Sequence, residues 1–169
     1  MGVLRHLALS VAVAIAALAS LPASADPAPA PVGPVLLVVD GDVDGAPVEL
    51  DRAALQSLPR TEFTTSTLWT EGERAFAGVL VADLLEAVGG EDASQLTAYA
   101  LNDYKVELPG SDAVSGGPII AYEMDGAAMS VRDKGPLWIV YPYDADSRFR
   151  TEEVYSRSIW QLTRITVHD

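Results

Sequence analysis

The sequence predicts an α+β domain with mixed β-sheets and a few short helices. Most apolar segments are short, contain β-branched or aromatic residues, and are separated by Gly, Pro, Asn or Asp, which is typical of strands joined by turns. Two segments carry helix signals instead, so we expect few helices. The 169-residue chain has no cysteine, so core packing must hold the fold without disulfides.

The first residues are typical of a signal peptide, which is removed on export. Arg5 supplies a positive start, residues 7–18 form an apolar run, and Ala23-Ser24-Ala25 is a small-residue cleavage pattern before Asp26. We therefore expect residues 1–25 to be a signal peptide and the protein to be periplasmic or secreted. An uncleaved membrane anchor is the alternative.

The rest of the chain is interpreted as a leader followed by one domain. Residues 26–34 alternate Pro and Ala, which favours a stiff, extended leader. Residues 35–169 have the length of a single domain. No later apolar run is long enough to cross a bilayer, so we expect no membrane insertion after signal removal.

The first half of the domain combines strands with two short helices. Asp51 is a typical N-cap, and Pro59 ends the helix that follows it. Between residues 81 and 88 apolar residues recur at helical spacing, and Gly89-Gly90 is a typical helix end. We expect strands at residues 35–39, 48–50, 62–69 and 74–76, and helices at residues 52–58 and 81–88.

The second half consists mainly of strands. Asp125-Gly126 between two apolar runs is the strongest hairpin signal in the chain. Residues 137–141 are apolar, aromatic and β-branched, which is typical of a strand buried on both faces, and Pro142 ends it. We expect strands at residues 96–101, 106–108, 119–124, 127–129, 137–141 and 158–167, with one helical turn at residues 151–155.

The composition excludes several classes of function. A formal net charge of -13 argues against nucleic acid and anionic membrane surfaces as partners. The two histidines are His6, inside the expected signal peptide, and His168, the penultimate residue. A histidine metal site, a Ser/His/Asp triad, thiol chemistry and zinc or iron–sulfur sites on cysteine are therefore excluded. We assign no catalytic residue and no metal ligand.

One acidic segment has the spacing of a calcium loop. Asp40, Asp42 and Asp44 stand at positions one, three and five, Gly45 at six and Asp51 at twelve. Position twelve normally carries a bidentate Glu, a proline lies inside the loop, and the flanks are typical of strands. A plain acidic hairpin is the favoured interpretation, with calcium binding as the alternative.

Two tripeptides are candidates for ligand binding. Asn102-Asp103-Tyr104 places an amide, a carboxylate and a phenol at a break between strands, where they either converge on a ligand or form an Asx turn. Arg132-Asp133-Lys134 lies before a buried strand and either clamps a phosphate or carboxylate or forms a solvated loop with a local ion pair. The residues alone leave both pairs of alternatives open.

Four parts of the chain carry a family resemblance: Gly78 with Leu84-Leu85, residues 100–104 followed by Glu107-Leu108-Pro109, residues 129–138, and residues 155–165. Taken in this order, they resemble the sulfite-oxidase-like molybdopterin-binding domain of oxidoreductases. The resemblance spans most of the chain after the expected signal peptide. It implies a mixed α+β fold and, in the family's enzymes, molybdenum held by a pterin dithiolene and one protein cysteine.

The resemblance also implies a site. It puts Ser66, next to Thr67, at or beside the position of the family's cysteine, where a hydroxyl is a harder and more basic donor than a thiolate. Lys134-Gly135-Pro136 corresponds to a turn among the family's residues that bind the pterin phosphate. Arg157 corresponds to one lysine of that binding site, and Trp160 replaces another.

The missing thiol and the signal decide the functional prediction. Members of that family that carry molybdopterin are usually exported folded through a twin-arginine route. The expected signal peptide of this chain contains a single arginine, Arg5, and not a pair. We expect no bound cofactor, and a module for a small anionic ligand or an extracytoplasmic protein partner. The alternative is a periplasmic, molybdopterin-dependent oxidoreductase in which Ser66 or water completes the metal shell. The candidate ligand- or cofactor-binding residues are Ser66, Thr67, Asn102, Asp103, Tyr104, Arg132, Asp133, Lys134 and Arg157.

Overall fold

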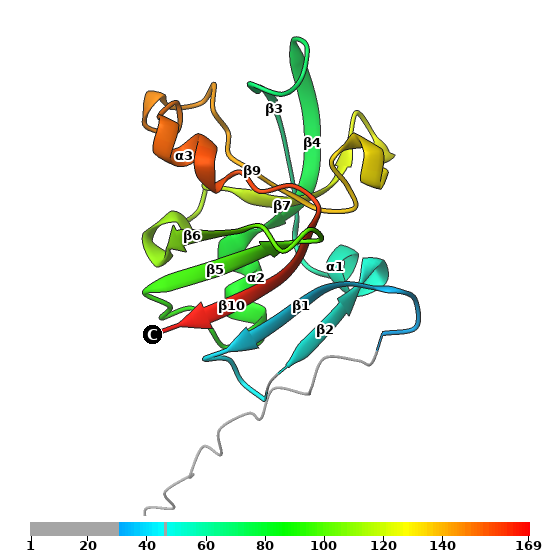
Figure 1. The fold of residues 1–169 in the computed structure, drawn as a ribbon, viewed down its shortest axis with the longest axis vertical. Helices are drawn as coiled ribbons and strands as arrows, with labels where there is room; N and C mark the ends of the chain where they lie inside the picture. The colour runs from blue at the N-terminus through cyan, green and yellow to red at the C-terminus, as the bar shows by residue number, and fades with distance from the viewer. Residues whose placement is uncertain (1–30, 46) are drawn as a thin grey trace, which may run out of the picture.

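Two β-sheets, one above the other in Figure 1, form the body of the protein. The computed structural model describes residues 31–45 and 47–169, so the expected signal peptide and most of the leader lie outside the described residues. The first sheet has the order β2-β1-β10-β5-β6, and the second has the order β3-β4-β7-β8, with β9 also paired to β7. The predicted fold class, mixed sheets with a few short helices, is confirmed.

The elements follow the sequence patterns closely. The first sheet contains β1 (Val35–Gly41), β2 (Val48–Asp51), β5 (Gln95–Ala100), β6 (Lys105–Pro109) and β10 (Leu162–His168). The second contains β3 (Arg60–Ser66), β4 (Glu73–Leu80), β7 (Ile119–Met124), β8 (Ala127–Ala128) and β9 (Trp138–Val140). The helices are α1 (Arg52–Ser57), α2 (Val81–Val88) and α3 (Glu152–Arg157), with 3-10 turns η1 (Gly110–Asp112), η2 (Val131–Asp133) and η3 (Ser147–Phe149).

Helix α1 begins directly after Asp51, the predicted N-cap. The Asp51 carboxylate accepts a hydrogen bond from the amide of Ala54 at 2.8 Å, so it caps the helix as expected. Its other oxygen accepts from the amides of Val32 and Gly33 at 2.9 and 2.8 Å. Asp51 is buried, and one side chain therefore fastens the described end of the leader to the domain.

Helix α2 has the predicted bounds, and Gly89 ends it with a left-handed φ of 70°. The strand before it is longer than expected. The sequence predicts a strand only at residues 74–76, but β4 continues through Gly78 to Leu80. A Cβ atom at Gly78 would lie 2.1 Å from the carbonyl oxygen of Ile120, so glycine allows β4 to approach β7 closely.

The closing strand is shorter than the sequence predicts. It begins at Leu162 and not at Ser158, because Gln161 has a φ of 52° and breaks the extended conformation. The residues before it lie along the second sheet, where Ile159 accepts a backbone hydrogen bond from Ile139 and Trp160 bridges to Trp138. This segment thus crosses from one sheet to the other before β10 enters the first sheet between β1 and β5 (Figure 1).

Both sheets contribute to one hydrophobic core. Leu37 of β1, Phe76 of β4 and Ile165 of β10 are among its buried residues. All three residues of β9 are buried, as predicted for the strand at residues 137–141. Within the described part of the chain, none of the helices is long and apolar enough to span a membrane.

Candidate functional site

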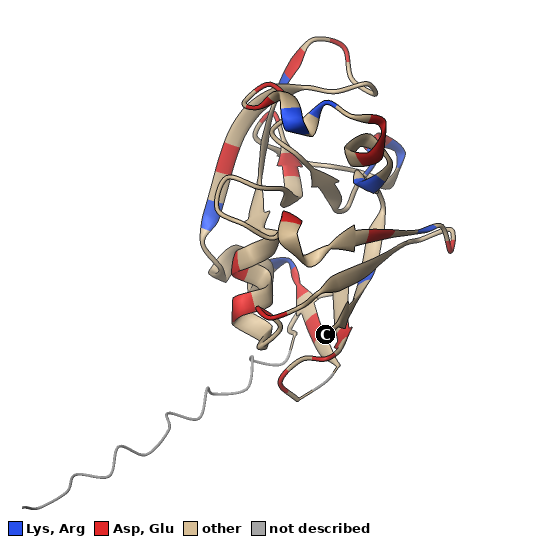
Figure 2. Cartoon of the chain, turned by 90° about the vertical axis from the view of Figure 1, so that its left-hand side faces the viewer, with Lys and Arg blue, Asp and Glu red and all other residues tan. Residues whose placement is uncertain are grey.

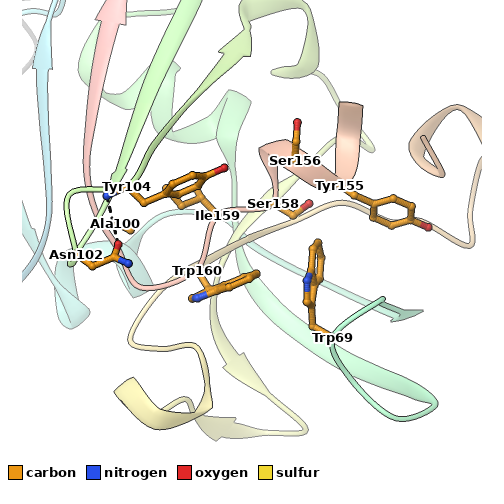
Figure 3. Close-up of a pocket in the computed structure, with 9 residues that line it drawn as sticks. All are labelled: Trp69, Ala100, Asn102, Tyr104, Tyr155, Ser156, Ser158, Ile159 and Trp160. Carbon is orange, nitrogen blue, oxygen red and sulfur yellow. Dashed lines mark hydrogen bonds between the residues drawn. The ribbon is translucent and has the colours of Figure 1, made fainter. Parts of the chain in front are cut away.

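Three loop regions meet around an aromatic pocket of about 390 Å³ (Figure 3). Trp69 comes from the loop between β3 and β4, and Tyr104 from the turn between β5 and β6. The remaining wall consists of residues from the end of α3 and from the segment that leads from α3 to β10. The lining residues are Trp69, Ala100, Asn102, Tyr104, Tyr155, Ser156, Ser158, Ile159 and Trp160. We call this space the aromatic pocket.

The rings around the aromatic pocket meet edge to face. The Trp69 ring centroid lies 5.5 Å from that of Trp160 and 6.0 Å from that of Tyr155, with interplanar angles of 68° and 83°. Behind them, the fully buried Trp138 lies 5.9 Å from Trp69 and 6.4 Å from Trp160. Edge-to-face contacts of this kind are favourable for aromatic pairs. All three tryptophans of the chain therefore form one cluster.

Hydrogen bonds in the loops position the two pocket tryptophans. Thr67 accepts a hydrogen bond from the amide of Trp69 at 3.0 Å, and its hydroxyl lies 2.8 Å from that of Thr70. On the other side, the Gln161 side-chain amide donates to the Val131 carbonyl oxygen at 2.8 Å. The predicted candidate Thr67 thus acts on the pocket through Trp69.

Three polar side chains of the lining, those of Asn102, Ser156 and Ser158, form hydrogen bonds within the protein. The Asn102 side-chain oxygen accepts from the amide of Tyr104 at 3.3 Å, which is the Asx turn foreseen as one alternative. The Ser158 hydroxyl donates to the Val154 carbonyl oxygen at 3.1 Å and also bonds the hydroxyl of Tyr143. Burial raises the pKa of Tyr143 to about 12, so this phenol is neutral at physiological pH. None of the nine described lining residues is charged.

Ser66 lies in a separate network centred on Asp144. The Ser66 hydroxyl donates to the Asp144 carboxylate, with oxygen–oxygen distances of 2.7 and 3.0 Å, and the Thr65 hydroxyl adds a bond of 3.2 Å. The amide and hydroxyl of Ser66 hold the pKa of Asp144 below its usual value. An anionic carboxylate therefore occupies the surroundings of the position that the resemblance assigns to a cysteine.

Arg157 is committed to two carboxylates. Its guanidinium contacts Asp112 at 3.0 Å and also pairs with Glu153, and its side chain is 15% exposed. Asp112 in turn accepts from the Tyr141 hydroxyl at 2.7 Å, and burial raises the pKa of that phenol. The charge of Arg157 is thus neutralised inside the fold.

The other two cationic candidates are Arg132, in the η2 turn, and Lys134, directly after it. Neither is part of the lining of the aromatic pocket. Arg132 is exposed, and the Asp133 carboxylate accepts from the Ser130 hydroxyl at 2.6 Å. The Lys134 ammonium lies 5.6 Å from the centroid of the Trp138 ring. Among the described residues, neither Arg132 nor Lys134 forms an ion pair with a carboxylate.

These networks test whether the residues fit a molybdenum–pterin cofactor. The family's enzymes, as the resemblance implies, need a soft thiolate on the metal and cations for the pterin phosphate. Here the chain has no cysteine, Ser66 bonds an anionic carboxylate, and Arg157 is already paired twice. The residues present do not fit that cofactor, and we derive no chemistry through it.

Residues 40–45 and 47–51 of the acidic segment belong to the β1–β2 hairpin. Asp40 accepts from the Arg164 guanidinium at 2.7 Å and the Thr166 hydroxyl at 2.6 Å, and Asp42 accepts from the amide of Asp169 at 3.2 Å. In the described part of the chain, no group of three or more carboxylates or histidines is placed to hold a metal ion. The acidic hairpin is the interpretation that fits.

The structure groups the nine candidates differently from the sequence. Asn102 and Tyr104 line the aromatic pocket, with Asp103 in the same turn at a φ of 63°. The others lie in the networks described above. Sequence reasoning missed Trp69 and Tyr155. It expected Trp69 inside a strand at residues 62–69, but β3 ends at Ser66 and Trp69 lies in the loop that follows. The signal that was available was the small number of tryptophans, three in the whole chain.

Comparison with known proteins agrees with the resemblance. The family model described as the oxidoreductase molybdopterin binding domain matches residues 34–145. Among solved structures, the sulfane dehydrogenase SoxCD from Paracoccus pantotrophus is similar, with a TM-score of 0.60 and 19% sequence identity over 79% of this chain and 38% of that chain. The chain thus spans well under half of that structure's length. No curated protein gives a match.

The matched region covers more than half of the sequence, from the residue before β1 to the loop after β9. The structural similarity, at this identity, concerns the fold alone. Together they confirm the resemblance that the sequence motifs indicated. This chain belongs to the oxidoreductase molybdopterin-binding domain family, as a member without any cysteine.

Proposed function

We propose that this domain binds a small ligand in the aromatic pocket and works without a molybdenum cofactor. The observation that carries the proposal is the described lining itself, to which four aromatic side chains contribute and in which neither a thiolate nor a charged group is present. Small-molecule sites are typically concave, mostly apolar, and roughly 300–1,000 Å³ in volume. The aromatic pocket, at about 390 Å³, has these properties.

Exposure of the rings supports binding from solvent. Trp160 is 38% exposed and Tyr104 is 53% exposed, although both are large apolar side chains that burial would stabilise. Rings held at the surface by turns, without a covering element among the described residues, are suited to contact a ligand. The Asn102 amide and the Tyr104 hydroxyl are polar groups that would orient it.

Metal analysis tests the cofactor part of this proposal. The full chain is produced in a host that assembles molybdopterin, purified, and assayed for molybdenum and for pterin fluorescence after denaturation. We expect neither. Molybdenum at about one atom per chain with an accompanying pterin would overturn the proposal and support the alternative, a molybdopterin-dependent oxidoreductase.

Tryptophan fluorescence tests the ligand part. Since all three tryptophans lie in the cluster around the aromatic pocket, a ligand bound there should change the intrinsic emission. A chemically mixed library of small molecules is screened, and hits are titrated by calorimetry. Trp160→Leu should abolish binding, whereas Val35→Ala, at an exposed apolar residue outside the lining, should not. A library without a single hit would overturn this part.

Exposed apolar residues next to the aromatic pocket favour a second candidate, a protein-interaction module. Leu68 precedes Trp69 and is 66% exposed, and Leu101 precedes Asn102 and is 59% exposed. Large exposed apolar patches mark interaction surfaces. If a partner docks there, Leu68→Asp should prevent its recovery by crosslinking in native extracts, while Val35→Asp should leave recovery unchanged.

We also propose that the protein is exported, with residues 1–25 removed and residues 35–169 acting as one domain. The charged start, apolar run and small-residue site at the beginning of the chain support this. The intact mass of protein from the native cell envelope or culture medium measures the cleavage. A mass that corresponds to a chain starting at Asp26 is expected, and an uncleaved chain would contradict it.

A further inference from the structure

We infer that the aromatic pocket takes a small soluble organic cation whose charge is carried by a fully methylated ammonium group. The inference rests on the proposed ligand-binding function and adds the chemical class of the ligand. The observations that carry it are the arrangement of the rings, the charges around them, a cation–π contact within the tryptophan cluster, and a described lining that contains no carboxylate.

The rings form adjoining walls. Trp69 meets Trp160 at 68° and Tyr155 at 83°, so neighbouring faces are turned toward different directions and do not stack on each other. Figure 3 shows Trp69, Trp160 and Tyr104 grouped around the same space. Rings at steep angles let one compact cation contact several electron-rich faces at once, as in the aromatic cages that bind quaternary ammonium groups.

The described lining contains no charge that would repel a cation, and the protein as a whole is acidic. None of its nine described lining residues is basic, and the nearby Arg157 is neutralised by Asp112 and Glu153. The formal net charge is -13, and acidic residues are spread over many elements (Figure 2). Such a field raises the local concentration of cations and disfavours anions.

The tryptophan cluster already holds a cation in the structure. The Lys134 ammonium lies 5.6 Å from the centroid of the Trp138 ring, within the range of a cation–π contact. Trp138 is fully buried and is not part of the lining, so this contact leaves the rings of Trp69 and Trp160 available. The expectation of an anionic ligand depended on Arg132 and Lys134, which lie outside the lining.

The hydrogen-bonding groups distinguish a methylated from a primary ammonium. A primary ammonium carries three donors, and each loses water on entering the pocket. None of the nine described lining residues has a carboxylate to accept from these donors, and the Ser158 hydroxyl is already bonded to Val154 and Tyr143. A methylated ammonium has no N–H group to satisfy, so a lining of ring faces suits it.

Paired calorimetric titrations of the full chain test the inference. The probes are choline and its neutral isostere, in which carbon replaces the ammonium nitrogen, both in low-salt buffer. Because the two have nearly the same shape, the charge alone distinguishes them. We expect choline to bind more tightly by roughly tenfold, the size of a cation–π contribution. Ethanolamine, the primary amine, should bind more weakly than choline.

Variants show whether the rings are responsible. Tyr104→Phe keeps the ring and should retain choline binding within about twofold, whereas Tyr104→Leu should weaken it roughly tenfold. Tyr104 is exposed and contributes its backbone amide to the turn, so both variants should fold with an unchanged thermal midpoint. Equal binding by both Tyr104 variants would overturn the role of the ring.

The outcomes separate this inference from the proposed function. If the isostere binds as tightly as choline, or if library hits are neutral or anionic while choline fails, the cation is overturned but ligand binding at the aromatic pocket stands. If phosphate or acetate binds and Arg132→Ala abolishes it, the anionic alternative replaces this inference. Binding of phosphatidylcholine vesicles without binding of free choline would overturn the assignment to a soluble ligand.

Discussion

Gln161 and Lys134 both have left-handed backbone conformations, and the amide of Gln161 donates a hydrogen bond to the Lys134 carbonyl oxygen at 3.0 Å. Their φ angles are 52° and 69°. Non-glycine residues rarely adopt this conformation, which costs of order 1 kcal/mol at each position and persists where surrounding contacts impose it. The pair joins the η2 turn to the segment that carries Trp160, so it places one wall of the aromatic pocket.

The first prediction concerns this join. Gln161→Ala removes the 2.8 Å hydrogen bond to the Val131 carbonyl oxygen, keeps the strained φ, and should lower the free energy of unfolding by about 1 kcal/mol. Gln161→Gly removes the same bond but relieves the strain, so it should be the more stable variant of the two. Urea denaturation measures both. A glycine variant less stable than the alanine variant would show that φ is not strained there.

The second prediction concerns pH and Asp51. Hydrogen bonds from the amides of Ala54, Gly33 and Val32 lower the pKa of this carboxyl. Its folded pKa therefore lies below the unfolded value of about 4, so its stabilising effect is complete above that pH and is lost as pH falls through the lower folded value. Asp51→Asn should reduce the loss of stability on acidification.

The measurement is urea denaturation of the wild type and Asp51→Asn between neutral pH and acid. Asp92→Asn, at an exposed carboxyl without a hydrogen bond among the described contacts, is the control and should follow the wild type. Parallel pH profiles for the wild type and Asp51→Asn would contradict the prediction.

The third prediction concerns the position of the missing thiolate. Ser66→Cys places a thiol beside the anionic Asp144, which disfavours the thiolate and should raise the pKa of the thiol above about 8.5. Alkylation by iodoacetamide across a pH series measures it. Thr67→Cys, next in the chain but bonded to Thr70 and the Trp69 amide, is the matched control. A thiol at position 66 that reacts faster at neutral pH than the control would show a site arranged to stabilise a thiolate.

The fourth prediction separates a structural role for Arg157 from a ligand-binding one. Arg157→Ala leaves the carboxylate of Asp112 without its cation in a largely buried place and should lower the free energy of unfolding by about 3 kcal/mol. Arg132→Ala, at an exposed residue, should change it by less than about 0.5 kcal/mol. Chemical denaturation gives both values. If Arg157→Ala proves as mild as Arg132→Ala, the pair with Asp112 contributes little to the fold.

Local sequence determined most of the elements. The Asp51 cap, the helix at residues 81–88 with Gly89 at its end, and the hairpin at Asp125-Gly126 are all where the sequence predicted them. Each depends on hydrogen bonds or steric limits among residues a few positions apart, so the sequence contains the needed information. The absence of cysteine likewise followed from the sequence alone.

Only the tertiary structure decided which side chains meet. Trp69 and Trp160 come from loops far apart in the chain, and no local pattern shows that their rings lie 5.5 Å apart. The same holds for the pairing of Arg157 with Asp112. The physical reason is that long-range packing selects loop conformations, including the left-handed Gln161 that ends one segment and begins β10. The chain's own residues thus fixed the elements, and the packing of two sheets around one core made the aromatic pocket.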